Sequence, residues 1–387
     1  MQLSSEDLLR LNVLLANDIE AIRIDEQHMT VYGLARGNEA RIPLSPNCRP
    51  EKYLRLVREM LSSHVLGSPG GYPVFLQRWT RMGQAREAQL DKLLLLGEPE
   101  AVIAVAGAAG LSDDLARRAW WAMPTADIAR RLLEKDVVVK GRMGQELAAY
   151  LVEHLPFETE PLTVIATVRL ILQSGLIDTE ARGRIFRLGT HRNVYHIGFL
   201  DAVPDDLPQP LPARSDYAAY RDRLAVLVEH GNALAAFLAK LLDAPGQTFL
   251  AVSETQLQHP VDKYTVAALM DIIGNYFRPA RGGAEPAGEI DAALKCTETL
   301  MASARDELET LLEGVPELRN EIGAMLTLAH TGERLVTPII AVTTASGTLL
   351  RRKLEPVVNP VLQQYAVLRK IAPPQTGTTS HRHSPNR

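Results

Sequence analysis

The sequence predicts a mainly α-helical protein that begins with a small α+β unit. Strand-like alternation is confined to residues 22–44, a helical module is duplicated in the centre of the chain, and helical apolar periodicity fills the last third. A chain of 387 residues also exceeds the usual size of one hydrophobic core. We therefore expect an α+β domain with a three-stranded meander, a duplicated HEAT-like α-helical repeat domain, a helical bundle and a disordered tail, at residues 1–70, 71–208, 209–371 and 372–387.

The N-terminal unit is predicted from short apolar patterns separated by turns. Residues 5–16 carry a broad leucine face behind a Ser4 cap candidate, which is typical of a short helix. Alternating residues then predict three strands between Ile22 and Leu44. Pro50 suits the first turn of a following helix, which is expected to close the unit before the glycine-rich loop at 67–71.

Three strings recur in the same order roughly 60 residues later, which indicates an internal repeat. The matched pairs are Arg81–Gln84 with Arg142–Gln145, Glu98–Ala104 with Glu160–Ala166, and Gly110–Arg117 with Gly175–Arg182.

Each copy of this module has a proline that can start a helix and an acidic residue that can cap the next one. Pro99 and Pro161 fit the first helical turn, where the missing amide hydrogen is not needed. Asp113 and Asp178 then suit the following N-terminus. Such helical units bury their apolar faces by stacking on neighbours, so a short HEAT-like α-solenoid is expected.

A proline-rich loop at 204–212 is expected to precede the C-terminal bundle. Apolar spacing of three and four residues predicts the bundle helices. They are expected at 216–243, 261–277, 289–313, 316–330, 334–352 and 356–371.

Composition narrows the class of protein. A net charge of −4 gives no global field for nucleic acid or an anionic membrane, so nucleic-acid binding is disfavoured, although local sites are left open. The acidic N-terminus does not resemble a secretory signal, and the weakly polar stretch 335–350 is too short for a membrane span and predicts a buried helix. Two distant cysteines favour a reducing compartment, so the cytoplasm is the expected location.

The sequence contains no phosphate-binding loop, dinucleotide fingerprint, zinc-protease helix or nucleophile elbow, so no catalytic residue, cofactor or metal is expected. His191 and His196 lie five residues apart, a spacing that misses one helical face. Cys48 and Cys296 are the candidate thiols for sulfur chemistry, although buried or incidental cysteines are commoner.

Two features suggest an interaction surface. Arg117 and Arg118 in the first copy and Arg182 in the second are candidate surface cations, for which solvated structural roles are the alternative. The pair Trp120–Trp121 could form a binding hot spot. Because the corresponding positions of the second copy are Ile185–Phe186, core packing is the favoured interpretation of the tryptophans.

Five strings in the first third of the chain resemble the DsrS family, the cytoplasmic accessory proteins associated with dissimilatory sulfite reductase in sulfur-oxidising bacteria. They are Leu9–Asn17, His64–Pro73, Arg78–Gln84, Leu93–Pro99 and Leu115–Ala122. The resemblance implies a supporting or regulatory role in cytoplasmic sulfur oxidation and transfers no functional residue.

The leading hypothesis is therefore a non-catalytic accessory protein that binds a protein of the sulfur-oxidation machinery; its oligomeric state is left open. Two alternatives remain at this stage. A thiol-based sulfur carrier or redox sensor would use Cys48 or Cys296. An RNA-binding regulator would use the helical repeats.

Overall fold

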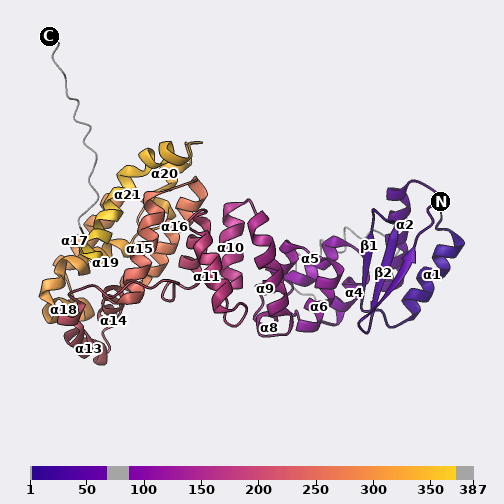
Figure 1. The fold of residues 1–387 in the computed structure, drawn as a ribbon, viewed down its shortest axis with the longest axis horizontal. Coiled ribbons are helices and arrows are strands. Elements are labelled where there is room, and N and C mark those ends of the chain that lie inside the picture. The colour runs from indigo at the N-terminus through magenta and orange to yellow at the C-terminus, as the bar shows by residue number, and fades with distance from the viewer. Residues whose placement is uncertain (1, 68–86, 372–387) are drawn as a thin grey trace, which may run out of the picture. The chain divides into compact units, whose positions relative to one another are not determined.

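The computed structural model describes residues 2–67 and 87–371. It confirms the predicted fold class, because a three-stranded antiparallel sheet near the N-terminus is followed by a helical body (Figure 1). By packing, the chain forms two compact units, residues 1–157 with 173–177 and residues 158–172 with 178–387. The domain boundaries expected at residues 70 and 208 stay predictions.

The first unit begins with the predicted helix, meander and helix. Its elements are α1 (Ser5–Ala16), β1 (Ala21–Asp25), β2 (Thr30–Ala35), β3 (Asn38–Pro43) and α2 (Pro50–Leu66), with strand order β1-β2-β3. The Ser4 hydroxyl caps α1 by accepting a hydrogen bond from the Asp7 amide at 3.2 Å, and Pro50 occupies the first turn of α2. Gly67 ends α2 in the left-handed conformation, and the remainder of the 67–71 turn lies outside the described residues.

The two faces of the sheet carry different side chains because successive strand residues point in opposite directions. Ile22, Val31 and Ile42 share one face and form a core with α1 and α2. Arg23 and Tyr32 pair in register on the other face.

Further helices follow in the described residues of the first unit. They are α4 (Glu87–Leu93), α5 (Pro99–Gly107), α6 (Asp113–Ala122), α7 (Ala126–Leu133), α8 (Asp136–Val139), α9 (Met143–His154) and the 3₁₀ turn η1 (Leu155–Phe157). The amide of Ile22 on β1 donates to the carbonyl of Leu94 at 2.8 Å, so the edge of the sheet is tied to the segment after α4.

The second unit is helical in its described residues. Its elements are α10 (Pro161–Ile171), α11 (Thr179–Leu188), α12 (Val194–Ala202), η2 (Tyr217–Ala219), α13 (Arg221–Glu229), α14 (Ala233–Leu242), α15 (Ala244–Gln258), α16 (Lys263–Tyr276), η3 (Arg278–Ala280), α17 (Ile290–Ala302), α18 (Asp306–Gly314), η4 (Pro316–Leu318), α19 (Arg319–Ala329), η5 (Glu333–Leu335), α20 (Thr337–Ile340) and α21 (Gly347–Arg369). Within it, α15 packs against α12, α14, α16 and α21.

The second string contains a helix start in both copies, with Pro99 starting α5 and Pro161 starting α10, whereas Arg81–Gln84 of the first string lies outside the described residues. Asp178 caps α11 by accepting from the Ala181 amide at 2.7 Å. In the first copy Ser112 is the cap of α6, and Asp113 follows it in the first turn. Because α5 and α10 belong to different units, the shared HEAT-like stacking stays a prediction.

Two long helices predicted for the last third are wrong, because each is broken by a turn. The 216–243 helix divides into α13 and α14 at Gly231, which has a φ of 85°, and at Asn232, which caps α14. The 289–313 helix divides into α17 and α18 after Ser303, where Asp306 has a φ of 50°.

The predicted helix at 334–352 is also wrong. Only η5 and the single-turn α20 form before residue 347, and Val342 is 83% exposed, so 335–350 is not one buried helix. Instead α21 runs without interruption through Pro356 and Pro360, where a helix start was expected. The expected helices at 261–277 and 316–330 correspond to α16 and α19 with their flanking turns, and the expected disordered tail lies outside the described residues.

Candidate functional site

A row of half-buried and exposed rings on the first unit is the best candidate for a binding site. Trp120 on α6 meets Tyr150 on α9 edge to face, with 4.7 Å between ring centroids. Tyr150 in turn stacks on His154, one helical turn further along α9, at 3.8 Å. Phe157 in η1 continues the spacing and is 81% exposed. We call Trp120, Tyr150, His154 and Phe157 the aromatic stripe.

Hydrogen bonds fix three members of the aromatic stripe in place. The Trp120 indole Nε1 donates to Glu146 Oε1 at 3.0 Å, and the Tyr150 hydroxyl donates to the carbonyl of Pro124 at 3.2 Å. The His154 Nδ1 lies 2.9 Å from the Tyr150 carbonyl, so this nitrogen carries the hydrogen. The rings therefore present apolar area in a fixed arrangement before any partner binds.

Neither tryptophan is the fully buried core residue that the repeat favoured, since both side chains are half-buried. Their indole N–H groups need acceptors, and each finds a carboxylate. Trp121 donates to Glu39 Oε2 at 3.2 Å, and the Arg23 guanidinium lies 4.9 Å from its ring centroid. Trp121 thus joins α6 to the sheet, which leaves Trp120 as the member turned to α9.

The predicted surface arginines are held in ion pairs. Arg117 contacts Glu20 at 2.7 Å and Asp114 at 3.0 Å, while Arg118 pairs with Asp91 at 3.2 Å and also with Asp114. In the second unit, Arg182 pairs with Asp206 at 2.6 Å. These carboxylates neutralise the cations, so the arginines form no unpaired basic patch.

The two candidate thiols have different surroundings. Cys48 follows β3, and its thiol donates a long hydrogen bond to the Arg49 carbonyl at 3.8 Å. Cys296 lies half-buried on α17, with its sulfur 3.5 Å from Nε2 of His330 at the end of α19. The cysteine is identifiable as a candidate thiol from the sequence, but this histidine, which comes from a segment 34 residues away, is not.

A pocket of about 270 Å³ in the second unit lies beside His196. The His196 Nε2 lies 3.0 Å from the Phe186 carbonyl, and its Nδ1 lies 3.2 Å from the Gln256 amide nitrogen. Burial lowers the pKa of His196, and the hydrogen bond to Phe186 only partly opposes this. A neutral ring with both nitrogens engaged suits a structural role for His196.

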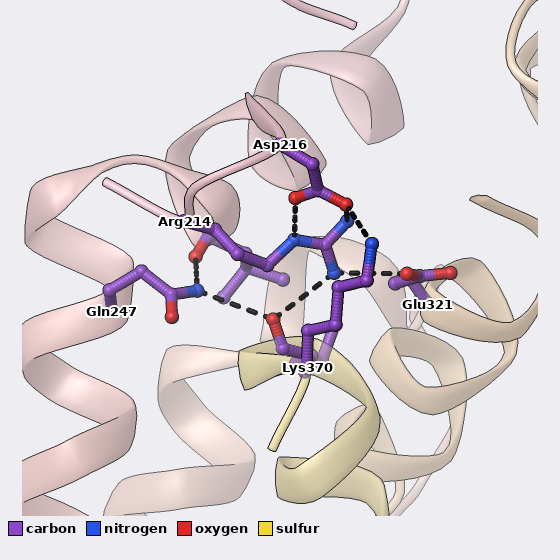
Figure 2. Close-up of polar contacts among 7 residues, drawn as sticks. Arg214, Asp216, Gln247, Glu321 and Lys370 are labelled. Carbon is purple, nitrogen blue, oxygen red and sulfur yellow. Dashed lines mark hydrogen bonds and ion pairs between the residues drawn. The ribbon is translucent and has the colours of Figure 1, made fainter. Parts of the chain in front are cut away.

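The second unit also contains a buried ion cluster, shown in Figure 2. Arg214 donates to both carboxylate oxygens of Asp216, at 2.6 and 3.2 Å, and to Glu321 at 2.9 Å. Lys370 reaches Asp216 at 2.8 Å, and Gln247 donates to the Leu368 carbonyl at 3.3 Å.

This cluster connects the loop before η2 to α15, α19 and the end of α21. Burial alone would raise the pKa of Asp216. The hydrogen bonds from Lys370 and Arg214 outweigh this effect and hold that pKa below its ordinary value. The saturated contacts indicate a structural junction rather than a catalytic group.

Within residues 2–67 and 87–371, no group of three or more His, Cys, Asp or Glu side chains is arranged to hold a metal ion. The same residues include no helix with the length and apolarity needed to cross a membrane. Comparisons with protein-family models, with curated proteins and with solved structures give no match to this chain.

Proposed function

We propose that this chain is a non-catalytic accessory protein that binds another protein through the aromatic stripe. The observation that carries this proposal is the set of half-buried and exposed rings held by the Glu146, Pro124 and Tyr150 contacts. Tryptophan and tyrosine dominate the energetics of protein interfaces because they bury large areas with few rotatable bonds. Rings that are already ordered lose less entropy on binding, which favours affinity.

The charge pattern favours a protein partner over RNA. Polyanion binding depends on unpaired cations that displace counterions from phosphates. Here the three candidate arginines face Glu20, Asp114, Asp91 and Asp206 instead. The aromatic stripe, with the Glu146 carboxylate beside Trp120, better suits a partner surface that offers apolar side chains and a cation for stacking.

The resemblance of the first third to the DsrS family suggests the pathway and location. We therefore propose that the chain acts in the cytoplasm and that its partner belongs to the sulfur-oxidation machinery, with dissimilatory sulfite reductase as the partner to test first. The aromatic stripe includes Trp120, which falls within one of the resembling strings, Leu115–Ala122.

The test measures binding of the full chain to purified dissimilatory sulfite reductase by biolayer interferometry. Phe157→Ser should weaken binding about tenfold or more, since a buried interface phenylalanine contributes more than about 1.4 kcal/mol. The matched control is Val342→Ser, because Val342 is 83% exposed and Phe157 81%. The control should bind like the unmodified chain.

Two outcomes would contradict different parts of the proposal. If the unmodified chain shows no binding at tens of micromolar reductase, the assignment of the partner is wrong. If it binds but Phe157→Ser and Trp120→Ala bind equally well, the aromatic stripe is not the interface. Circular dichroism of each variant checks that the helices remain.

A further inference from the structure

Cys296 and His330 form a thiol–imidazole pair between two packed helices of the second unit. The 3.5 Å separation between sulfur and Nε2 is within the range of a sulfur hydrogen bond. Cys296 is half-buried on α17, so part of the residue is open to solvent. His330 is 3% exposed, and its carbonyl accepts from the Ala287 amide at 3.0 Å, so the backbone on which the ring sits is held in place.

The protonation state of His330 suits a base. The backbone of Glu285 also takes part in a hydrogen bond to this histidine. With Nε2 turned to the sulfur, Nδ1 is the nitrogen left to donate to Glu285, so Nε2 is an acceptor. Burial lowers the pKa of His330 and the charge of Arg281 acts in the same direction, so the ring is neutral near pH 7.

These contacts reproduce the arrangement of an activated nucleophile, in which a base faces the thiol and a third group orients the base. We infer that Cys296, paired with His330, is a site of S-thiolation that reacts with low-molecular-weight disulfides. The inference is independent of the aromatic stripe, which lies in the other unit.

The reaction is a thiol–disulfide exchange. His330 Nε2 accepts the proton of the Cys296 thiol as the sulfur attacks one sulfur of the disulfide. The disulfide bond breaks, a mixed disulfide forms on Cys296, and the released thiolate takes the proton back from His330. No net oxidant beyond the disulfide is needed.

Cys48 provides an internal reference because its thiol contacts a backbone carbonyl rather than a base. Two single-thiol chains, Cys48→Ser and Cys296→Ser, would be reacted with an aromatic disulfide, dithiobis(2-nitrobenzoate), at pH 7. A free thiol of ordinary pKa is about 3% ionised at that pH, so complete activation could raise the rate at most about 30-fold. We expect Cys296 to react about tenfold faster than Cys48.

The decisive variant is His330→Asn in the Cys48→Ser chain. The asparagine amide can still donate a hydrogen bond to the Glu285 backbone, but it cannot act as a base. The rate at which Cys296 reacts with the disulfide should therefore fall about tenfold. A variant that unfolds would expose the thiol and react faster, so a slower reaction cannot come from loss of structure. With oxidised glutathione, mass spectrometry should find the adduct on Cys296.

Equal rates for the two cysteines would overturn the inference, and so would an unchanged or increased rate in a His330→Asn chain whose helices are shown by circular dichroism to remain. The same substitution made in the Cys296→Ser chain is the control, and it should leave the reactivity of Cys48 unchanged.

Discussion

Replacing Arg214 by alanine should destabilise the second unit far more than breaking one of the surface ion pairs of that unit would. The Arg214 side chain is 2% exposed, and its carboxylate partners Asp216 and Glu321 are 20% and 13% exposed (Figure 2). Removing the cation leaves two poorly solvated carboxylates. Breaking a buried ion pair from one side costs about 3–5 kcal/mol.

The expected value lies at the lower end of that range, because Asp216 keeps Lys370 at 2.8 Å. We therefore expect a loss of about 3 kcal/mol, equivalent to a shift of about 1 M in the urea midpoint. Lys370→Ala is the matched control within the same cluster. The Lys370 side chain is 62% exposed, so this substitution should shift the urea midpoint far less than Arg214→Ala.

The assay can separate the two units. The three tryptophans are at positions 79, 120 and 121, and residues 158–387 contain none, so tryptophan fluorescence does not report on the second unit. Far-ultraviolet circular dichroism follows the helices of both units. Arg214→Ala should lower the urea midpoint seen by circular dichroism and leave the fluorescence midpoint in place. A change no larger than that of Lys370→Ala would refute the reasoning that Arg214 is a buried junction.

Two further predictions concern a buried acid and a close backbone contact. Burial raises the pKa of Glu98 to about 7 despite Arg58 at 2.9 Å, so the folded state binds more protons than the unfolded state above pH 4.5. The free energy of unfolding measured by fluorescence should therefore fall by about 3 kcal/mol as pH rises from 4.5 to 7. Glu98→Gln is the control and should remove this pH dependence. The same absence of pH dependence in the unmodified chain would contradict the prediction. Gly274→Ala should cost about 1–3 kcal/mol in urea unfolding, since a Cβ there would lie 2.1 Å from the Thr331 carbonyl oxygen. Gly323→Ala, in open space on α19, should instead be neutral or stabilising; similar losses in both variants would show that the close contact is not responsible.

Local chemistry made the N-terminal part of the fold predictable. Ser4, Pro50, Pro99 and Pro161 mark helix starts through interactions with their own neighbours in sequence, and the structure has helices at each of them. The meander was equally readable, since its strands alternate with a period of two and are joined by short turns.

The breaks in the C-terminal helices were harder to predict because periodicity hides short interruptions. A turn of three or four residues shifts the apolar stripe by about one helical turn, so the spacing across it still looks continuous. Gly231 and Asn232 were the available signal for the break between α13 and α14. Asp306, which has a positive φ, was a weaker signal for the break between α17 and α18.

The candidate sites depend on contacts between distant segments, which one sequence does not reveal. Cys296 was identifiable as a thiol, but His330 meets it only through the packing of α17 on α19. Arg214 meets Glu321 across 107 residues in the same way. Tyr150, His154 and Phe157 do share helical spacing, and this was the signal available for the aromatic stripe.

The difference between the repeat copies supports a specialised role for the first one. At the matched positions the second copy has Ile185 and Phe186, which are 2% and 5% exposed, whereas Trp120 and Trp121 are half-buried. Aliphatic or phenyl side chains would satisfy packing in both copies, and they would need no hydrogen-bond acceptor of the kind that an indole N–H group requires. The contact of Trp121 with Arg23 and Glu39 explains one tryptophan structurally. Trp120 instead donates to Glu146 and meets Tyr150 on α9, and this half-buried arrangement is the one to which we propose that another protein binds.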